Sequence, residues 1–259
     1  RNHLKFNTMM ESVTLILAAF LTSMLSAIIG MGGGVTLLGI MAIIMPEGYL
    51  VVAYHGIIQL VSNVTRATVY REHIERKIFN QYFFGIIPGL CIAAMIIYAL
   101  TELYSVSSAN QIKFDYLKPL IGFYIIWFLY IRKKDKVVSE TAFLWLGGLS
   151  GLVTVFIGAA GPMIAPFFMN KDLKKESIIA TKALCQAIGH LGKIPIFIFL
   201  FNVNYLADWK VILPLVLAVY CGTKFGKMML GKLPEETFKI LFKIALTLIG
   251  LRLILLNLI

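Results

Sequence analysis

The sequence predicts an all-α polytopic membrane protein with two inverted structural repeats. The chain of 259 residues is 59% hydrophobic, and its mean hydropathy is +0.85. Apolar runs of about twenty residues, the length that a helix needs to cross a bilayer, recur from end to end. Polar and glycine residues of the first half reappear in the same order 126 to 128 positions later, as in membrane proteins built from repeated halves.

The apolar runs between charged, glycine and proline residues predict the membrane segments in order. One long run in each half is interrupted by glycine, so each repeat is expected to hold a glycine-broken hairpin or discontinuous helix plus about three transmembrane helices. The predicted segments are 13–45 (broken), 50–70, 78–100, 114–131, 142–169 (broken), 175–200, 210–226 and 237–257. The corresponding boundaries are an N-terminal tail (1–12), repeat 1 (13–131), a basic linker (132–141) and repeat 2 (142–259).

The distribution of lysine and arginine indicates how the two broken segments lie in the membrane. If each crossed once, these residues would be spread evenly over both faces. If each enters and returns, one face holds 14 of them: Arg71, Arg76, Lys77, Arg132, Lys133, Lys134, Lys136, Lys171, Lys174, Lys175, Lys224, Lys227, Lys232 and Lys239. The other face keeps Arg1, Lys5, Lys113, Lys118 and Lys210. The positive-inside rule favours returning hairpins, which makes the repeats inverted, the linker cytoplasmic and both termini external. A pair of complete crossings gives the same sidedness and stays open.

Composition and motifs argue against several classes of function. The net charge of +11 comes from short connections between apolar segments, where lipid headgroups and the positive-inside rule account for it, so no nucleic acid is expected. The three cysteines, Cys91, Cys185 and Cys221, lack metal-ligand spacing. No paired carboxylates, phosphate loop or Ser/His/Asp set appears. We therefore expect no enzyme activity, no metal and no cofactor.

The interiors of the predicted membrane segments contain basic groups but no carboxylate, because every acidic residue falls in a tail, a loop or a segment end. Charged groups at this depth are costly and usually functional, so an uncompensated basic interior predicts that the missing counter-ion is an anionic substrate. Lys243 and Arg252 in the last segment lack polar neighbours and are expected to extend to the headgroup interface. The other interior ionisable groups are His55, Arg66, Lys182, His190 and Lys193.

These five groups belong to two polar stripes. The first stripe, at positions i, i+4, i+7, i+8 and i+11 of one helix face, consists of His55, Gln59, Ser62, Asn63 and Arg66. The second repeats it 127 positions later with Lys182, Gln186, Gly189, His190 and Lys193. Polar stripes in a bilayer face each other or water, so a shared site is expected. The alternative is that Arg66 and Lys193 reach an interface while the other side chains only hydrogen-bond between helices. His55 and His190 titrate nearest neutral pH and are the candidates for proton coupling.

The glycine breaks are expected to form the other wall of the site. Without a Cβ the chain can turn there and expose N–H groups, and the helix that restarts after each break directs its positive dipole end to the same place. Pro162 suits a first-turn position. This predicts a midplane oxyanion site, with close packing of small residues as the alternative. The expected contributors are Gly32, Gly33, Gly34, Val35, Gly161, Pro162 and Met163.

The order of these motifs resembles the TauE/SafE sulfite exporter family of bacterial membrane transporters over nearly the whole chain. The matching stretches are Gly30-Met-Gly-Gly-Gly34, His55 to Asn63 with Arg66, Gly158 to Pro166, and Ala180 to Pro195. Gly39 departs from the family pattern, which commonly has proline there. The resemblance implies movement of sulfite, organosulfonates or related small oxyanions across the bacterial inner membrane.

From this resemblance we expect a multi-pass inner-membrane secondary transporter, an exporter that works by alternating access around the midplane site. An anion-selective channel is the alternative. The expected partners are a small anionic substrate and membrane lipids, with a homodimer left open as the oligomeric state.

Overall fold

The computed structural model describes residues 9–30, 32–45, 48–106, 109, 117–131, 139, 141–169, 173–230 and 234–255, and this part of the chain is helical throughout apart from short connections. The first half contains α1 (Met9–Ile29), α2 (Gly33–Ile44), α3 (Gly48–Val69), the 3-10 turn η1 (Arg71–His73), α4 (Arg76–Leu103), α5 (Leu117–Ile126) and its π-helical continuation η3 (Trp127–Ile131). The second half contains α6 (Ala142–Phe156), α7 (Gly161–Met169), α8 (Lys175–Phe201), α9 (Trp209–Leu230) and α10 (Glu235–Leu255).

The prediction of an all-helical polytopic membrane protein is confirmed. By length and composition α1, α4, α8 and α9 can each cross a membrane, and both long apolar runs are interrupted where glycine predicted it. The tail 1–12 is described only from Met9, where α1 already begins, and most of the linker 132–141 lies outside the described residues.

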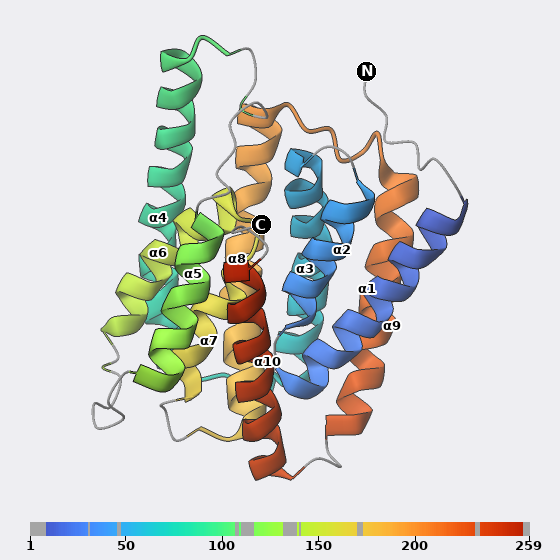
Figure 1. Ribbon diagram of the computed structural model, residues 1–259, viewed down its shortest axis with the longest axis vertical. Coiled ribbons are helices and arrows are strands. Elements are labelled where there is room, and N and C mark those ends of the chain that lie inside the picture. The colour runs from blue at the N-terminus through green and yellow to red at the C-terminus, as the bar shows by residue number, and fades with distance from the viewer. Residues whose placement is uncertain are drawn as a thin grey trace.

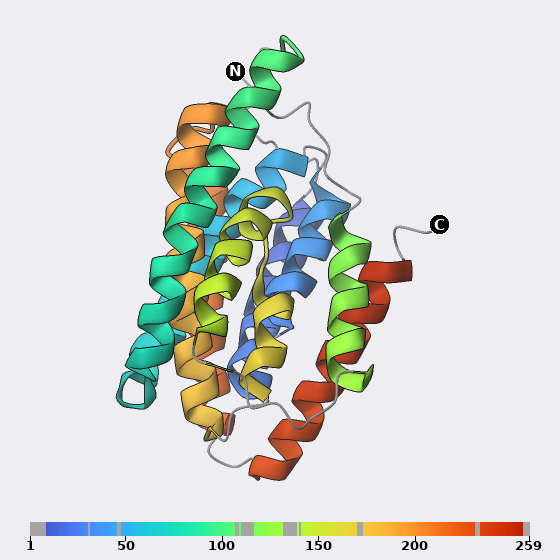
Figure 2. The same cartoon turned by 90° about the vertical axis from the view of Figure 1, so that its left-hand side faces the viewer.

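Each broken run turns back on itself. Along the vertical axis of Figures 1 and 2, α1 runs downward and α2 runs upward, whereas α6 runs upward and α7 runs downward. The turns need glycine because the backbone there enters the left-handed region, with φ of 80° at Gly30, 93° at Gly32 and 93° at Gly158. Any residue with a Cβ is strained in that region.

The two halves exchange helices: α1 and α4 of the first half pack along α9 and α6 of the second half, respectively. Glycine allows close contact in both pairs. A Cβ at Gly222 of α9 would lie 2.3 Å from the carbonyl oxygen of Phe20, and one at Gly89 of α4 would lie 2.0 Å from that of Gly148. In the middle of the molecule α3 packs along α8. Figure 2 shows α5 and α10 together at one edge.

Basic residues gather at one end of the molecule, the lower end in Figure 1, where α3 and α9 finish and where α4 and α8 begin. We call this the lysine-rich end and define it by Arg71, Arg76, Lys77, Lys174, Lys175, Lys224 and Lys227. Helix α1 begins at the opposite end, and α10 runs toward it (Figure 1). The lysine-rich end carries residues from both halves of the chain.

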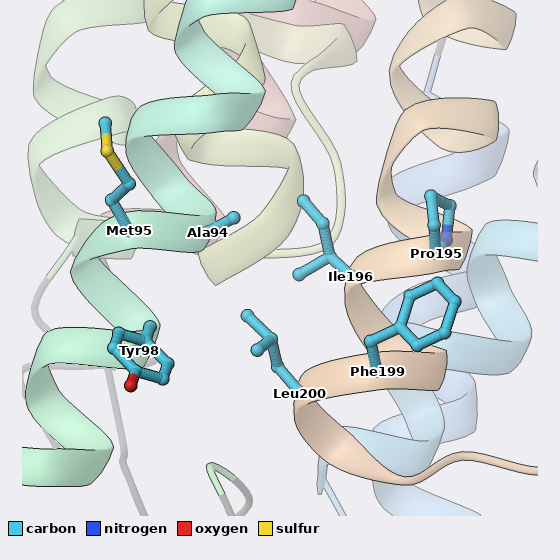
Figure 3. Close-up of a pocket in the computed structure, with 7 residues that line it drawn as sticks. All are labelled: Ala94, Met95, Tyr98, Pro195, Ile196, Phe199 and Leu200. Carbon is cyan, nitrogen blue, oxygen red and sulfur yellow. The ribbon is translucent and has the colours of Figure 1, made fainter.

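A groove of about 430 Å³ runs between α4 and α8 (Figure 3). Its lining side chains are Ala94, Met95 and Tyr98 from α4 and Pro195, Ile196, Phe199 and Leu200 from α8. Met95, Tyr98 and Phe199 are largely exposed. Because this lining offers no charged group and almost no hydrogen-bond donor, the groove does not suit an anion, although it is larger than the polar cavity described below.

Candidate functional site

The two polar stripes lie against each other where α3 meets α8. Their charged members are buried, with exposed fractions of 2% for Arg66, 1% for Lys182 and 0% for Lys193. The rings of His55 and His190 are edge to face with centroids 5.7 Å apart. Such burial rules out the alternative in which Arg66 and Lys193 extend to a membrane interface.

A small cavity lies between the stripes and the two glycine breaks. Its volume is about 20 Å³, which is room for about one water molecule. Its lining residues come from α1, α2, α3, α7 and α8 and from the second break: Ser26, Gly34, Val35, His55, Gln59, Arg66, Ala159, Gly161, Lys182, Gln186 and His190. The cavity therefore joins both halves of the chain. The remaining site candidates, Gly32, Gly33, Asn63, Pro162, Met163 and Lys193, lie outside this lining.

The first turns of α2 and α7 touch equivalent glutamines. A Cβ at Gly34 would lie 3.0 Å from Oε1 of Gln59, and one at Gly161 would lie 2.5 Å from Nε2 of Gln186. Both glycines precede their glutamine by the same number of residues. The Nε2–H of His55 also donates to the Gly34 carbonyl at 2.8 Å. A glycine at the start of each returning helix thus lets the backbone approach the polar stripe.

The amides at the two breaks are not equally available. Gly32 directly precedes α2, and the first helical hydrogen bond runs from the Thr36 N–H to the Gly32 carbonyl at 3.0 Å. The N–H groups before Thr36 belong to the first turn, in which N–H groups have no acceptor within the helix. Gly33 also has a packing role, because a Cβ there would lie 1.8 Å from the Thr22 carbonyl oxygen.

At the second break Pro162 has no N–H, and the Met163 N–H donates to the Ala160 carbonyl at 3.0 Å. The Met163 amide is therefore engaged within the chain. Gly161 is the residue of this turn that lines the cavity.

Two cations are held by backbone carbonyls next to the breaks. Arg66 donates from Nη1 to the Ser26 carbonyl at 3.2 Å and from Nη2 to Oδ1 of Asn63. Lys193 donates from Nζ to the Gly158 carbonyl at 3.0 Å. Arg66 and Lys193 occupy equivalent positions of the two stripes, so each half uses a cation to tie a stripe to a broken segment.

Two buried donors at or beside the cavity lack an acceptor among the described residues. Nε of Arg66 and Nδ2 of Asn63 are buried donors without a hydrogen-bond partner among the described residues, and the cavity lining there contains no carboxylate. A buried donor left unpaired is unfavourable. An anion with several oxygen atoms would supply the missing acceptors and the missing negative charge.

The structure adds a residue that the sequence did not single out. Ser26 lines the cavity and its carbonyl accepts from Arg66. Thr154, 128 positions later, has its Oγ1 3.4 Å from where a Cβ of Gly189 would be, beside the second stripe. The repeat could have indicated both hydroxyl residues, since each precedes a glycine break by four residues.

The two cations of the last helix each contact another helix. Lys243 stacks over the ring of Tyr130 with its Nζ 4.6 Å from the centroid. Arg252 reaches α2, where a Cβ at Gly39 would lie 2.3 Å from its Nη2. Gly39, at the position where proline was the expected family residue, therefore leaves room for a guanidinium group.

Within the described ranges there is no group of three His, Cys, Asp or Glu side chains that could hold a metal ion. Cys185 is buried, while Cys91 and Cys221 are exposed on their helices.

Comparison with protein families shows that the family model "Sulfite exporter TauE/SafE" matches residues 15–253. Comparisons with curated proteins and with solved structures give no match. The matched range includes both glycine breaks, both polar stripes and every helix that lines the cavity. The chain therefore belongs to the TauE/SafE sulfite exporter family.

Proposed function

We propose that this protein is a secondary transporter that exports small sulfur oxyanions, such as sulfite or organosulfonates, across the bacterial inner membrane. Members of the family are transporters rather than enzymes, and membership implies transport of sulfite or related sulfur anions. The observation that carries the anion site is the buried cavity between α3 and α8. Its described lining supplies an arginine, a lysine, two histidines and two glutamines but no carboxylate.

In the proposed site the cations attract the anion by their charge, and the neutral groups fix its orientation by hydrogen bonds. Arg66, Lys182 and Lys193 attract the anion, and the amides near Gly34 and Gly161 bind its oxygen atoms as helix N-termini commonly do. The side-chain amides of Gln59, Asn63 and Gln186 orient it. The cavity is too small for this ligand in the present arrangement, so anion binding must be accompanied by some separation of its walls.

We further propose that the halves are inverted repeats that give alternating access. The exchange of α1 and α4 between the halves and the opposite directions of the two hairpins support this. The positive-inside rule assigns the lysine-rich end to the cytoplasm. Transport then requires the cavity to open first toward one end and then toward the other.

Proton coupling is proposed to use the histidine pair. Because Nε2–H of His55 donates to the Gly34 carbonyl, a neutral His55 carries its lone pair on Nδ1, which has no hydrogen-bond partner within the described ranges. Protonation at Nδ1 would turn this acceptor into a donor for the anion. Sulfite flux in proteoliposomes with and without an imposed pH gradient tests the coupling, and equal fluxes would exclude it.

The anion site is tested by sulfite, sulfonate and thiosulfate flux into proteoliposomes. Lys182→Ala is expected to reduce the flux severely, while Lys210→Ala is the matched control, because Lys210 is exposed at the start of α9. Equal flux in the Lys182 variant and the wild type would refute the site.

An anion channel would also use a basic lining and remains the second candidate. The burial of the stripe residues favours a carrier, because a channel needs a continuous open path. Counterflow separates the two: a carrier exchanges labelled for unlabelled sulfite, whereas a channel gives conductance without exchange.

A further inference from the structure

Tyr70 continues the first polar stripe beyond Arg66. It follows α3 directly, and its N–H donates to the Arg66 carbonyl at 3.1 Å, so the helical hydrogen bonding extends to this residue. Residues four apart lie on the same helix face. The Tyr70 side chain therefore lies on the face of the stripe, at its lysine-rich end.

The Tyr70 hydroxyl is buried without a partner. The residue is 6% exposed, and its hydroxyl oxygen has no hydrogen-bond partner among the described residues. Lys227 covers the ring with its Nζ 5.6 Å from the centroid and donates instead to the Val69 carbonyl at 3.3 Å. A buried hydroxyl without a partner destabilises a folded protein, so packing alone would favour phenylalanine at this position.

Two charged groups interact electrostatically with Tyr70: Arg66 in the stripe and Glu176 in the first turn of α8. A tyrosine hydroxyl keeps its proton at neutral pH, so that of Tyr70 is available as a donor.

The second stripe ends differently. Phe197 follows Lys182 by the same fifteen positions that separate Tyr70 from His55. Phe197 is 1% exposed and stacks on Phe201 with ring centroids 4.5 Å apart. Both stripes thus end in a buried aromatic ring, but only the ring at the lysine-rich end carries a hydroxyl.

We propose that Tyr70 is a further substrate-contacting residue, whose hydroxyl donates a hydrogen bond to the anion as the anion passes between Arg66 and the lysine-rich end. This inference rests on the proposed transport function. Tyr70 does not line the closed cavity, so the contact forms when the site opens toward the lysine-rich end. The other exit, past Phe197, offers no equivalent donor.

The experiment compares Tyr70→Phe with wild type in membrane vesicles of both orientations, using labelled sulfite. Loss of a hydrogen bond to a charged ligand is expected to raise KM at least about tenfold in inside-out vesicles, where the lysine-rich end faces the medium. In right-side-out vesicles KM should stay within about twofold, because that exit lacks the donor. Tyr98→Phe, in the apolar groove between α4 and α8, removes an exposed hydroxyl and is the matched control.

Thermal unfolding in detergent gives the second readout. Because Tyr70→Phe removes an unsatisfied buried hydroxyl, its melting temperature should equal or exceed that of wild type. An unchanged KM in both vesicle orientations overturns the role of Tyr70 and leaves the transport function standing. An equal rise of KM in both orientations with a lower melting temperature shows a structural role and overturns it too. Absence of sulfite transport by the wild type refutes the proposed function itself.

Discussion

Gly158→Ala tests whether the second break depends on its backbone conformation. Gly158 has φ of 93°, and placing an L side chain in the left-handed region costs about 1–2 kcal/mol. The new Cβ would lie 3.2 Å and 3.3 Å from the two γ carbons of Val52 and 3.4 Å from Cδ1 of Leu38. These contacts are tight enough to require small shifts, so the total destabilisation is expected to be about 1–3 kcal/mol.

The measurement is the melting temperature of purified protein in detergent. At about 2–4 °C per kcal/mol for a chain of this size, Gly158→Ala should melt roughly 2–12 °C lower than wild type. Gly48→Ala is the control, because a Cβ there meets no atom within 4 Å and its φ is not positive. It should melt at the wild-type temperature or slightly above it. The same melting temperature for Gly158→Ala and wild type would show that the break does not need a left-handed residue.

Three other substitutions probe the cation, the helix packing and the first turns of α3. Arg66→Lys keeps the positive charge but loses the planar guanidinium group, which donates in two directions. The affinity for sulfite, measured by calorimetry, should therefore fall about tenfold. An unchanged affinity would show that the charge alone suffices. Gly89→Val forces α4 away from the Gly148 carbonyl, which should lower the free energy of unfolding by about 1–3 kcal/mol or more. The monodisperse fraction in size-exclusion chromatography should fall as well. An unaltered elution profile would contradict the close packing of α4 on α6. Tyr54→Phe removes the 2.5 Å hydrogen bond to Asp208. The free energy of unfolding, measured by chemical denaturation, should fall by about 1.5–3 kcal/mol. A stability equal to that of wild type would mean that this hydrogen bond contributes little.

Periodicity made the overall arrangement predictable. The 127-residue offset between stripes identified α3 and α8 as partners, and the glycines marked both breaks, because membrane helices are apolar enough for any polar or glycine pattern to stand out. The four helices long enough to span lie within predicted segments or extend them by a few residues. These features depend on local sequence, which explains why sequence reasoning found them.

Details that depend on distant contacts were not predictable in the same way. The contact of Arg252 with Gly39 joins α10 to α2, and neither residue's own surroundings in the sequence indicates the other. The packing of Gly33 on the Thr22 carbonyl and the engagement of the Met163 amide by Ala160 depend on how sharply each break turns. A glycine pattern predicts that a turn exists but not which amides remain available after it forms.

The exchange of α1 and α4 between the halves has a consequence for biosynthesis. Because α1 packs along α9, the groove in α9 formed by Gly222 and its neighbours does not exist until most of the chain has been synthesised. The carbonyls of α1 that this groove covers, such as that of Phe20, must face lipid or other helices until then. A ribosome-bound fragment that ends before α9 therefore lacks the helix on which α1 packs, and final assembly is a late, long-range step of the slow kind. Shorter fragments should consequently be preferred substrates of membrane quality-control proteases.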